Sequence, residues 1–268
     1  MTGRVLAPPA QGGSAVGPAG GGPPLTRIDP HVHAGASECA RLTDEELLAW
    51  FDQHPEYVIV ASDHMSWGFY RRPELLPYAG RVLYSVEMTI ADRFDFLLLA
   101  SDSCVLDRLE SITMREGLRP PRPPMDLFGD PRVLVTFAHP PLFDTRPFAG
   151  LPDWLLELPV DLLEYNMARL AAHPRLGASG AAFGVPAVVE DASERLRRLR
   201  AEIFPGSRFV VGSDAHDSRS LGRTYLELKT ACADAGEAWE AMKRGDYMGR
   251  LEIRGIMFAI DPRDGLTP

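Results

Sequence analysis

The stretch Ile28-Asp29-Pro30-His31-Val32-His33 decides how the rest of the sequence is interpreted. Its two histidines are one residue apart at the end of a short extended run, so on a strand both imidazoles point to the same side. Four later segments also place a histidine or carboxylate just after an apolar run: Ser62-Asp63-His64, Val86-Glu87-Met88, Phe137-Ala138-His139-Pro140 and Gly212-Ser213-Asp214-Ala215-His216. Five strand ends that carry such ligands predict one metal site at the mouth of a barrel.

The distribution of the histidines supports this site. The chain has seven histidines, and only His54 and His173 lie outside these five segments. A single histidine after an apolar run is more often packed or solvated than bound to a metal. Five of seven in one local context is hard to obtain by chance, and therefore we expect metal binding.

Length and composition fit one domain. The chain has 268 residues, of which 45% are hydrophobic, and this is enough for one α/β barrel of ordinary size. Its formal net charge of −9 predicts that nucleic acid is not a partner, because a phosphate backbone would be repelled. A small anionic substrate remains compatible with this charge, since bound cations dominate the local field.

Three cysteines and the absence of long apolar runs bear on localisation. Cys39, Cys104 and Cys232 are scattered without a CxxC pair, which is unlike a disulfide framework or a structural zinc knuckle. No apolar run reaches the length of a membrane span, and residues 1–24 lack the apolar centre of a signal peptide. We therefore expect a cytoplasmic protein without a membrane partner.

The predicted elements alternate between strand and helix. Residues 1–24, rich in Gly, Pro and Ala, predict a flexible tail, and residues 25–268 a single domain. We expect strands at about 25–32, 57–61, 82–86, 96–100, 132–138, 160–163 and 208–212, helices at 47–53, 105–116, 190–204 and 237–244, and an extended segment at 251–260. Thr43 and Glu46 form a capping-box pattern before the first helix. This alternation predicts an α/β fold, with parallel strands in a closed or distorted barrel.

The order of the motifs from Asp29 to His216 resembles the PHP (polymerase and histidinol phosphatase) superfamily. The resemblance implies a distorted (β/α)7 TIM-like barrel, two or three divalent ions at the strand ends, and hydrolysis of phosphoesters. Transferred position by position, the metal ligands that it implies are His31, His33, Glu38, His64, Glu87, His139, Asp214 and His216. Glu38 stands where many members have Asp.

One departure concerns the third ion. Some members have a histidine after the strand that follows the glutamate motif, and here that strand ends Ala100-Ser101-Asp102. Asp102 is therefore a candidate ligand, and its alternative role is to cap the helix that begins near Val105. Two ions are expected on this basis, with a third dependent on Asp102.

The ligand types suggest the ions and the chemistry. Histidine and carboxylate without cysteine suit Zn, Mn or Fe in the divalent state. Two ions that share a water would supply a hydroxide to attack phosphorus, with Asp214 or His216 relaying a proton.

Candidate substrate-binding residues lie in loops after the ligand strands, where such barrels bind substrate. The candidates are Arg72, Arg146 and Arg223, although a single arginine is more often part of a surface ion pair. Asn166 is expected to face the site or Glu164 to orient a ligand, and simple packing at the strand end is the alternative.

The leading hypothesis is a metal-dependent phosphoesterase that acts on a small phosphorylated metabolite. One alternative is a hydrolase of amides or lactones, although the carboxylated lysine that often bridges the metals of amidohydrolases has no candidate, because Lys229 and Lys243 lie far downstream in predicted helices. A second alternative is a metal-binding barrel without catalytic activity.

Overall fold

The computed structural model describes residues 24–117, 119–140, 151–176 and 184–267. Nearly all of the predicted tail, residues 1–23, and the candidate Arg146 lie outside these residues. No helix within them is long and apolar enough to cross a lipid bilayer.

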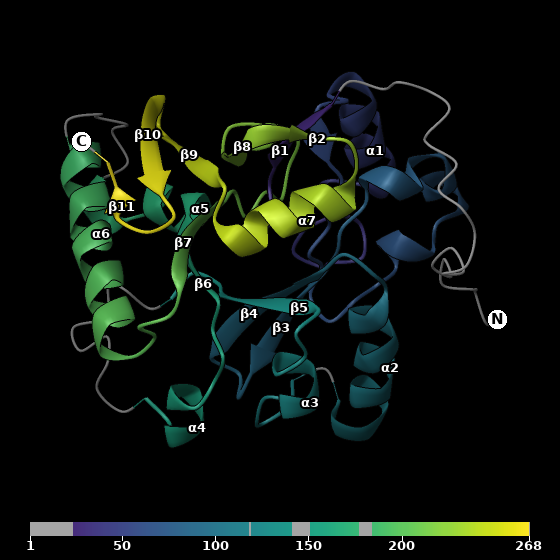
Figure 1. The fold of residues 1–268 in the computed structure, drawn as a ribbon, viewed down its shortest axis with the longest axis horizontal. Coiled ribbons are helices and arrows are strands. Elements are labelled where there is room, and N and C mark those ends of the chain that lie inside the picture. Colours follow the sequence, from purple (N-terminus) through teal and green to yellow (C-terminus); the bar gives the residue numbers. More distant parts are fainter. Residues whose placement is uncertain (1–23, 118, 141–150, 177–183, 268) are drawn as a thin grey trace.

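The strands of the described chain form two mixed sheets (Figure 1). The six-stranded sheet has the order β11-β10-β9-β8-β1-β2, and the five-stranded sheet has the order β3-β4-β5-β6-β7. The first consists of β1 (Leu25–Ile28), β2 (Tyr57–Val58), β8 (Tyr225–Cys232), β9 (Tyr247–Ile253), β10 (Ile256–Asp261) and β11 (Gly265–Leu266). The second consists of β3 (Tyr84–Ile90), β4 (Phe94–Ala100), β5 (Val133–Phe137), β6 (Leu162–Asn166) and β7 (Arg208–Gly212).

The prediction of a distorted (β/α)7 barrel is wrong, since these two sheets form no closed barrel within the described ranges, although the α/β class is correct. The cause lies in the connections. Only three residues, 91–93, join β3 to β4, and a connection this short forces an antiparallel pair, because a parallel pair needs a crossover of a dozen or more residues. β4 and β5 are antiparallel as well, while β5, β6 and β7 run parallel.

Isolated parallel bridges connect the two sheets. Val32, after β1, pairs with Ala215, after β7. Ile59 pairs with Val82, and His64 pairs with Glu87, so the chain after β2 lies against β3. These bridges bring the carboxyl ends of strands from both sheets together, and this junction positions the site.

Helices cover the sheets on several sides. They are α1 (Asp44–Gln53), α2 (Cys104–Glu116), α3 (Met125–Phe128), α4 (Asp153–Leu156), α5 (Met167–Ala171), α6 (Val185–Glu202) and α7 (Ala235–Arg244), with 3-10 turns η1 (Phe69–Arg71), η2 (Pro73–Arg81) and η3 (Pro174–Leu176). Figure 1 shows α6 at one side of the molecule and α2 at the other, with the sheets between them. The long α6 buries an apolar face against the core, because Val188, Ala192, Leu196 and Leu199 recur at helical spacing.

The start of α1 agrees with the sequence prediction, and the segment 251–260 does not. The capping box of α1 is confirmed: Thr43 Oγ1 accepts the N–H of Glu46, and Glu46 Oε2 accepts the N–H of Thr43. The single extended segment expected at 251–260 is instead a hairpin of β9 and β10. Its turn contains Arg254 and Gly255, both at positive φ, as a tight hairpin requires.

Candidate metal centre

Four of the predicted ligands lie on two segments that pair directly. His31 and His33 follow β1, and Asp214 and His216 follow β7. The N–H of Asp214 donates to the carbonyl of His31 at 2.9 Å, and the N–H of His33 donates to the carbonyl of Ala215 at 2.9 Å. This pairing brings the two segments side by side, and Asp214 Oδ1 lies 3.4 Å from His31 Nε2 and 3.3 Å from His33 Nε2.

The hydrogen bonds of His31 and His33 fix the proton positions on both rings. Nδ1 of His31 donates to Glu164 Oε1 at 2.7 Å. The hydroxyl of Ser37 donates to Asp63 Oδ1 at 2.6 Å, so at 3.2 Å it must accept from Nδ1 of His33. In the neutral form of each ring, with its proton on Nδ1, Nε2 carries a lone pair, and the two Nε2 atoms lie 3.1 Å apart. Partners of this kind are the ones that orient histidine ligands in metal sites.

Two buried carboxylates lie beside these two Nε2 atoms. Glu87 Oε2 lies 3.1 Å from His33 Nε2 and 3.6 Å from His31 Nε2, and Asp214 Oδ1 lies 3.3 Å and 3.4 Å from the same two nitrogens. Glu87 Oε2 makes no hydrogen bond, although Glu87 is only 1% exposed. This buried oxygen without a hydrogen bond lies beside two imidazole nitrogens, and a divalent cation fits such a donor set.

The electrostatic field of the cluster favours positive charge. Burial alone would lower the pKa of His31, but the carboxylates of Glu164, Asp214 and Glu87 outweigh it and raise that pKa well above its usual value. Burial likewise opposes ionisation of Glu87, yet His31 and His139 hold its pKa well below the usual range. The same cluster that attracts a proton here would attract a metal ion.

The remaining histidines complete the cluster around Glu87. His139 Nε2 lies 2.9 Å from Glu87 Oε1, and His64 Nδ1 lies 3.2 Å from Glu87 Oε2. The ligand atoms fall into groups in which all lie within 4.8 Å of one another: His31, His33 and Asp214; His31, Glu87 and His139; His33, His64 and Glu87; and His33, Cys39 and His216. Overlapping groups of this kind suit more than one ion.

Backbone strain accompanies the ligands. His139 has a φ of 27° and Asp214 a φ of 53°, values that non-glycine residues seldom adopt. Such strain persists only where the surroundings hold it, and it concentrates at functional sites. Here the N–H of His139 donates to Glu164 Oε2 at 2.8 Å, so one carboxylate holds both His31 and the strained His139.

Two predicted ligands belong to none of these groups. Glu38 is exposed, and its neighbour Cys39 lies in the cluster instead. Asp102 Oδ1 accepts the N–H of Cys104 at 2.8 Å at the start of α2, which is the geometry of its alternative role.

The substrate-binding candidates within the described residues, Arg72, Arg223 and Asn166, already form ion pairs or hydrogen bonds with other protein groups. Arg72 pairs with Asp44 and Glu45 at the start of α1, and Arg223 pairs with Glu252. The side chain of Asn166 caps α5 by accepting the N–H of Arg169 at 2.9 Å, and it donates to Glu164 Oε2 at 3.1 Å.

A cavity of about 300 Å³ opens beside His139 and Glu164. Its lining includes the exposed side chains of Arg93, in the turn between β3 and β4, and Arg169, on α5. Neither arginine is predicted from the sequence, because neither follows a ligand motif directly. The only signal for Arg169 was its place three residues after Asn166.

No protein-family model and no curated protein sequence matches this chain significantly. Among solved structures, it is similar to the lesion-specific endonuclease PfuEndoQ from Pyrococcus furiosus, with 15% identity and a TM-score of 0.53 over 82% of this chain and 55% of that one. The fold resembles that of endonuclease Q. A second structure, endonuclease Q in complex with a 27-mer duplex substrate with an abasic lesion at the active site, matches with 15% identity and a TM-score of 0.51, over 82% of this chain and 56% of that one. The chain thus spans about half the length of the proteins it matches.

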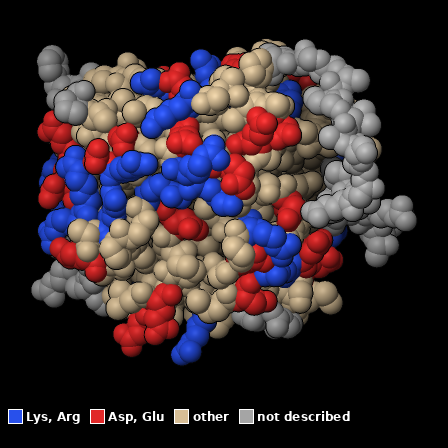
Figure 2. All heavy atoms as spheres, viewed as in Figure 1, with Lys and Arg blue, Asp and Glu red and all other residues tan. Residues whose placement is uncertain are grey.

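The prediction that nucleic acid is not a partner is wrong, because the similar structures are those of an endonuclease, one of them bound to duplex DNA. The net charge of −9 is a sum over the whole chain and does not describe the field at one site. On the face shown in Figure 2, basic and acidic side chains are intermingled over the described surface.

Proposed function

We propose that this chain is a metal-dependent phosphoesterase that cleaves phosphodiester bonds of nucleic acid. The observation that carries the proposal is the pair of lone-pair nitrogens, His31 Nε2 and His33 Nε2, 3.1 Å apart and flanked by Glu87 and Asp214. A donor set of histidine and carboxylate is typical of metal-assisted hydrolysis. The fold likeness to endonuclease Q, which is a lesion-specific endonuclease and has a structure in complex with duplex DNA, supports the class of substrate.

The groups of ligand atoms suggest how the ions would be held. His31, His33 and Asp214 would hold one ion, and His64 and Glu87, with His33 close by, a second; His139 would contribute beside Glu87. Divalent ions bound there would supply an activated water and positive charge for the phosphoryl oxygens. Zinc, manganese and iron are all compatible with histidine and carboxylate ligands.

The proton steps belong to the segment after β7. We assign to Asp214 the acceptance of a proton from the attacking water, because one of its carboxylate oxygens lies among the ligand nitrogens. His216 is about one-third exposed, and its Nδ1 lies 2.8 Å from the carbonyl of Asp214 and 3.5 Å from Asp214 Oδ1. A carbonyl oxygen only accepts, so Nδ1 of His216 carries its own proton, and this bond orients the ring beside Asp214.

The cavity next to His139 is the proposed place for the substrate backbone. Arg93 and Arg169 line this cavity, and a guanidinium binds phosphate oxygens through paired N–H donors. No observation favours the alternative of amide or lactone hydrolysis. Lys229 is exposed on β8, not on a helix as predicted, and Lys243 pairs with Glu240 on α7.

The test uses the full chain loaded with Mn²⁺ or Zn²⁺. Labelled single-stranded DNA, intact duplex and duplex with an abasic site are incubated with it, beside a phosphomonoester and an ester or amide panel. We expect metal-dependent cleavage of DNA that is lost on chelation and in Glu87→Gln. Cleavage of phosphomonoesters alone would contradict the substrate class, and turnover of amides or lactones alone would contradict the reaction. A metal-loaded protein inert on every substrate would favour a binding protein.

A further inference from the structure

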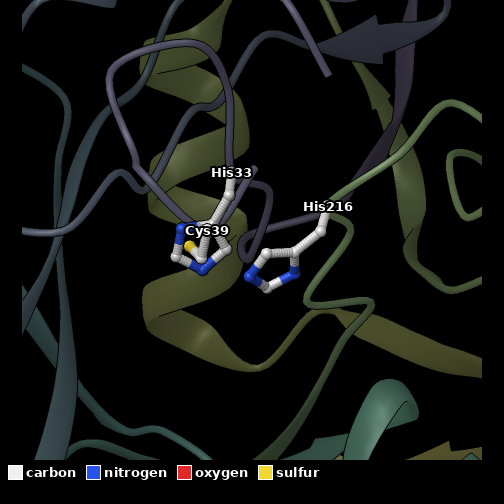
Figure 3. A group of neighbouring side chains, drawn as sticks. All are labelled: His33, Cys39 and His216. Carbon is white, nitrogen blue, oxygen red and sulfur yellow. The ribbon is translucent and has the colours of Figure 1, made fainter. Parts of the chain in front are cut away.

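The loop between His33 and α1 carries a cysteine into the metal centre. The side chains of His33, Cys39 and His216 point toward one another (Figure 3), and one ligand atom from each lies within 4.8 Å of the others. The rings of His33 and His216 stack with centroids 4.5 Å apart, and the free thiol of Cys39 lies beside them. These three residues come from two segments that are remote in sequence, so their convergence is a property of the fold.

Hydrogen bonds hold this loop at both ends. At its start, the N–H of Ala34 and the hydroxyl of Ser37 both donate to Asp63 Oδ1, at 2.8 Å and 2.6 Å. At its end, the N–H groups of Arg41 and Leu42 donate to the carbonyl of His216, at 2.7 Å and 3.0 Å. The backbone that presents Cys39 is therefore bound to the same residue whose side chain Cys39 faces. Such a loop is ordered before any ligand arrives, and this reduces the entropy lost on binding.

A second observation points to a cation at this place. Glu87 Oε2 is buried and makes no hydrogen bond, and it lies 3.1 Å from His33 Nε2 and 3.2 Å from His64 Nδ1. His33 is thus shared between the group that contains Cys39 and the group that contains this orphaned oxygen. Glu38, the adjacent acidic residue, is exposed and belongs to neither group.

We propose that Cys39 is a metal ligand, and that its thiolate makes this centre selective for zinc over manganese. The proposal rests on the metal centre of the proposed function and replaces Glu38 as the ligand expected from this loop. Binding breaks the S–H bond and forms a sulfur–metal bond, and the proton passes to solvent. A thiolate ligand favours zinc, while manganese prefers oxygen ligands, and the proposal therefore departs from the expectation of a site without sulfur.

Cobalt(II) spectroscopy on the full chain tests the assignment directly. The protein is stripped with a chelator and titrated with Co²⁺, which takes the same ligands as zinc and absorbs visible light. We expect a near-ultraviolet charge-transfer band from thiolate to cobalt in the unchanged protein and in Cys104→Ser. In Cys39→Ser this band should be lost while the visible bands of bound cobalt remain.

Affinity measurements add an independent readout. Removal of a partner that only orients a ligand already weakens metal binding about 10–100-fold, and Cys39→Ser should cost zinc at least as much. Manganese binding should change little, so the ratio of the zinc to the manganese affinity falls. Glu38→Ala is the matched variant from the same loop, and it should leave both affinities unchanged.

The rate at which Cys39 is alkylated can be measured in the unchanged protein. This test therefore needs no variant, and a variant that folds poorly cannot affect it. Zinc should protect Cys39 from iodoacetamide, as measured by mass spectrometry, while magnesium should not. Bound cobalt without a charge-transfer band, or alkylation of Cys39 unaffected by zinc, would overturn the role of Cys39 and leave the metal centre standing. A protein that binds no cobalt or zinc at all would overturn both proposals.

Discussion

At the scale of single residues, Glu164 holds two members of the cluster in place, and it is not itself one of the proposed ligands. One of its oxygens accepts from His31 Nδ1 at 2.7 Å, and the other accepts from the N–H of His139 at 2.8 Å. The first contact sets which nitrogen of His31 is free, and the second holds a strained backbone. Both depend on the charge and position of one carboxylate.

Glu164→Gln should therefore weaken metal binding although Glu164 is not a proposed ligand. The amide retains the size of the side chain and loses the negative charge that orients His31, so we expect affinity for Mn²⁺ or Zn²⁺ to fall about 10–100-fold. Isothermal titration calorimetry measures this change, and circular dichroism checks that the fold is retained. Glu190→Gln, at an exposed position on α6, is the control; equal affinities in the two variants would refute the role of Glu164.

Histidines and carboxylates after apolar runs could be picked out from the sequence as candidate ligands. The acid with which each arginine forms an ion pair could not. His31 and Asp214 each follow a strand and Glu87 lies within β3, and the apolar run before each of them is visible in the sequence. The partner of an arginine depends on which acid the fold brings near, and Arg72 pairs with Asp44 on α1 at 3.0 Å. Cys39 was set aside because it lacks a CxxC partner, and its ligand neighbours come instead from His33 and His216.

At the scale of elements, the close packing of β6 against β7 leaves no room for a side chain at Gly212. A Cβ atom there would lie 2.0 Å from Glu164 Oε1 and 2.8 Å from His31 Cβ. The end of β7 must therefore be glycine for the carboxylate to reach the imidazole.

Gly212→Ala should impair metal binding and lower stability together. The methyl group must displace Glu164 from His31, and overpacking of this kind costs about 1–3 kcal/mol. Thermal unfolding and a metal titration measure the two effects. Gly206→Ala, where a Cβ meets nothing within 4 Å, should change neither. Full metal affinity in Gly212→Ala would show that Glu164 is not needed where it lies.

The loop before β5 is joined to α2 through Asp130, and this contact responds to pH. Asp130 accepts hydrogen bonds from the Arg132 side chain and N–H, and it pairs with Arg108 of α2 at 2.9 Å. These contacts with Arg132, followed by the charge of Arg108, lower the pKa of Asp130 from 3.8 to about 2. A carboxyl whose folded pKa is depressed stabilises the fold above its unfolded pKa, and this contribution is lost as the pH falls toward the folded value.

Asp130→Asn should therefore destabilise the protein most above about pH 4, with the difference from the unchanged protein shrinking as the pH approaches 2. Urea unfolding at pH 6, 4 and 2.5 measures the difference. A difference that stays constant across this range would mean that the carboxylate charge contributes nothing.

Whether neighbouring strands pair parallel or antiparallel could not be predicted from the sequence. The apolar runs located β5 and β7 closely, but the run at 96–100 carried no sign that it pairs antiparallel with β3. The extension of β3 to Ile90 shortens the connection to three residues, and this boundary depends on pairing with β4. β8 was missed because only part of it is buried, so its apolar signal is weak.

At the scale of the whole molecule, net charge and local charge lead to different expectations for nucleic acid. The sum of −9 predicts repulsion, while Arg93 and Arg169 flank the cavity beside the proposed centre. Affinity for DNA depends on the phosphates that are neutralised locally, and each neutralised phosphate releases counterions and steepens the salt dependence.

Arg169→Gln should weaken DNA binding and reduce the slope of log K against log salt by about 0.9, the value for one phosphate contact on duplex DNA. Fluorescence anisotropy between low and moderate salt concentrations measures both quantities. Arg244→Gln, at a position on α7 where Arg244 pairs with Asp246, is the control and should alter neither. An unchanged slope in Arg169→Gln would exclude this arginine from contact with phosphate.

The pairing of the segments after β1 and β7 has a consequence for biosynthesis. The hydroxyl of Ser213 donates to the carbonyl of His31 across 182 residues of chain. The ribosome must therefore synthesise most of the polypeptide before His31 can contact Ser213 and Asp214. His31 and His33 leave the exit tunnel before Asp214 and His216 have been synthesised. The proposed metal centre can therefore form only after translation has passed these residues, and a product truncated before residue 213 would lack both Asp214 and the backbone that holds His31 in place.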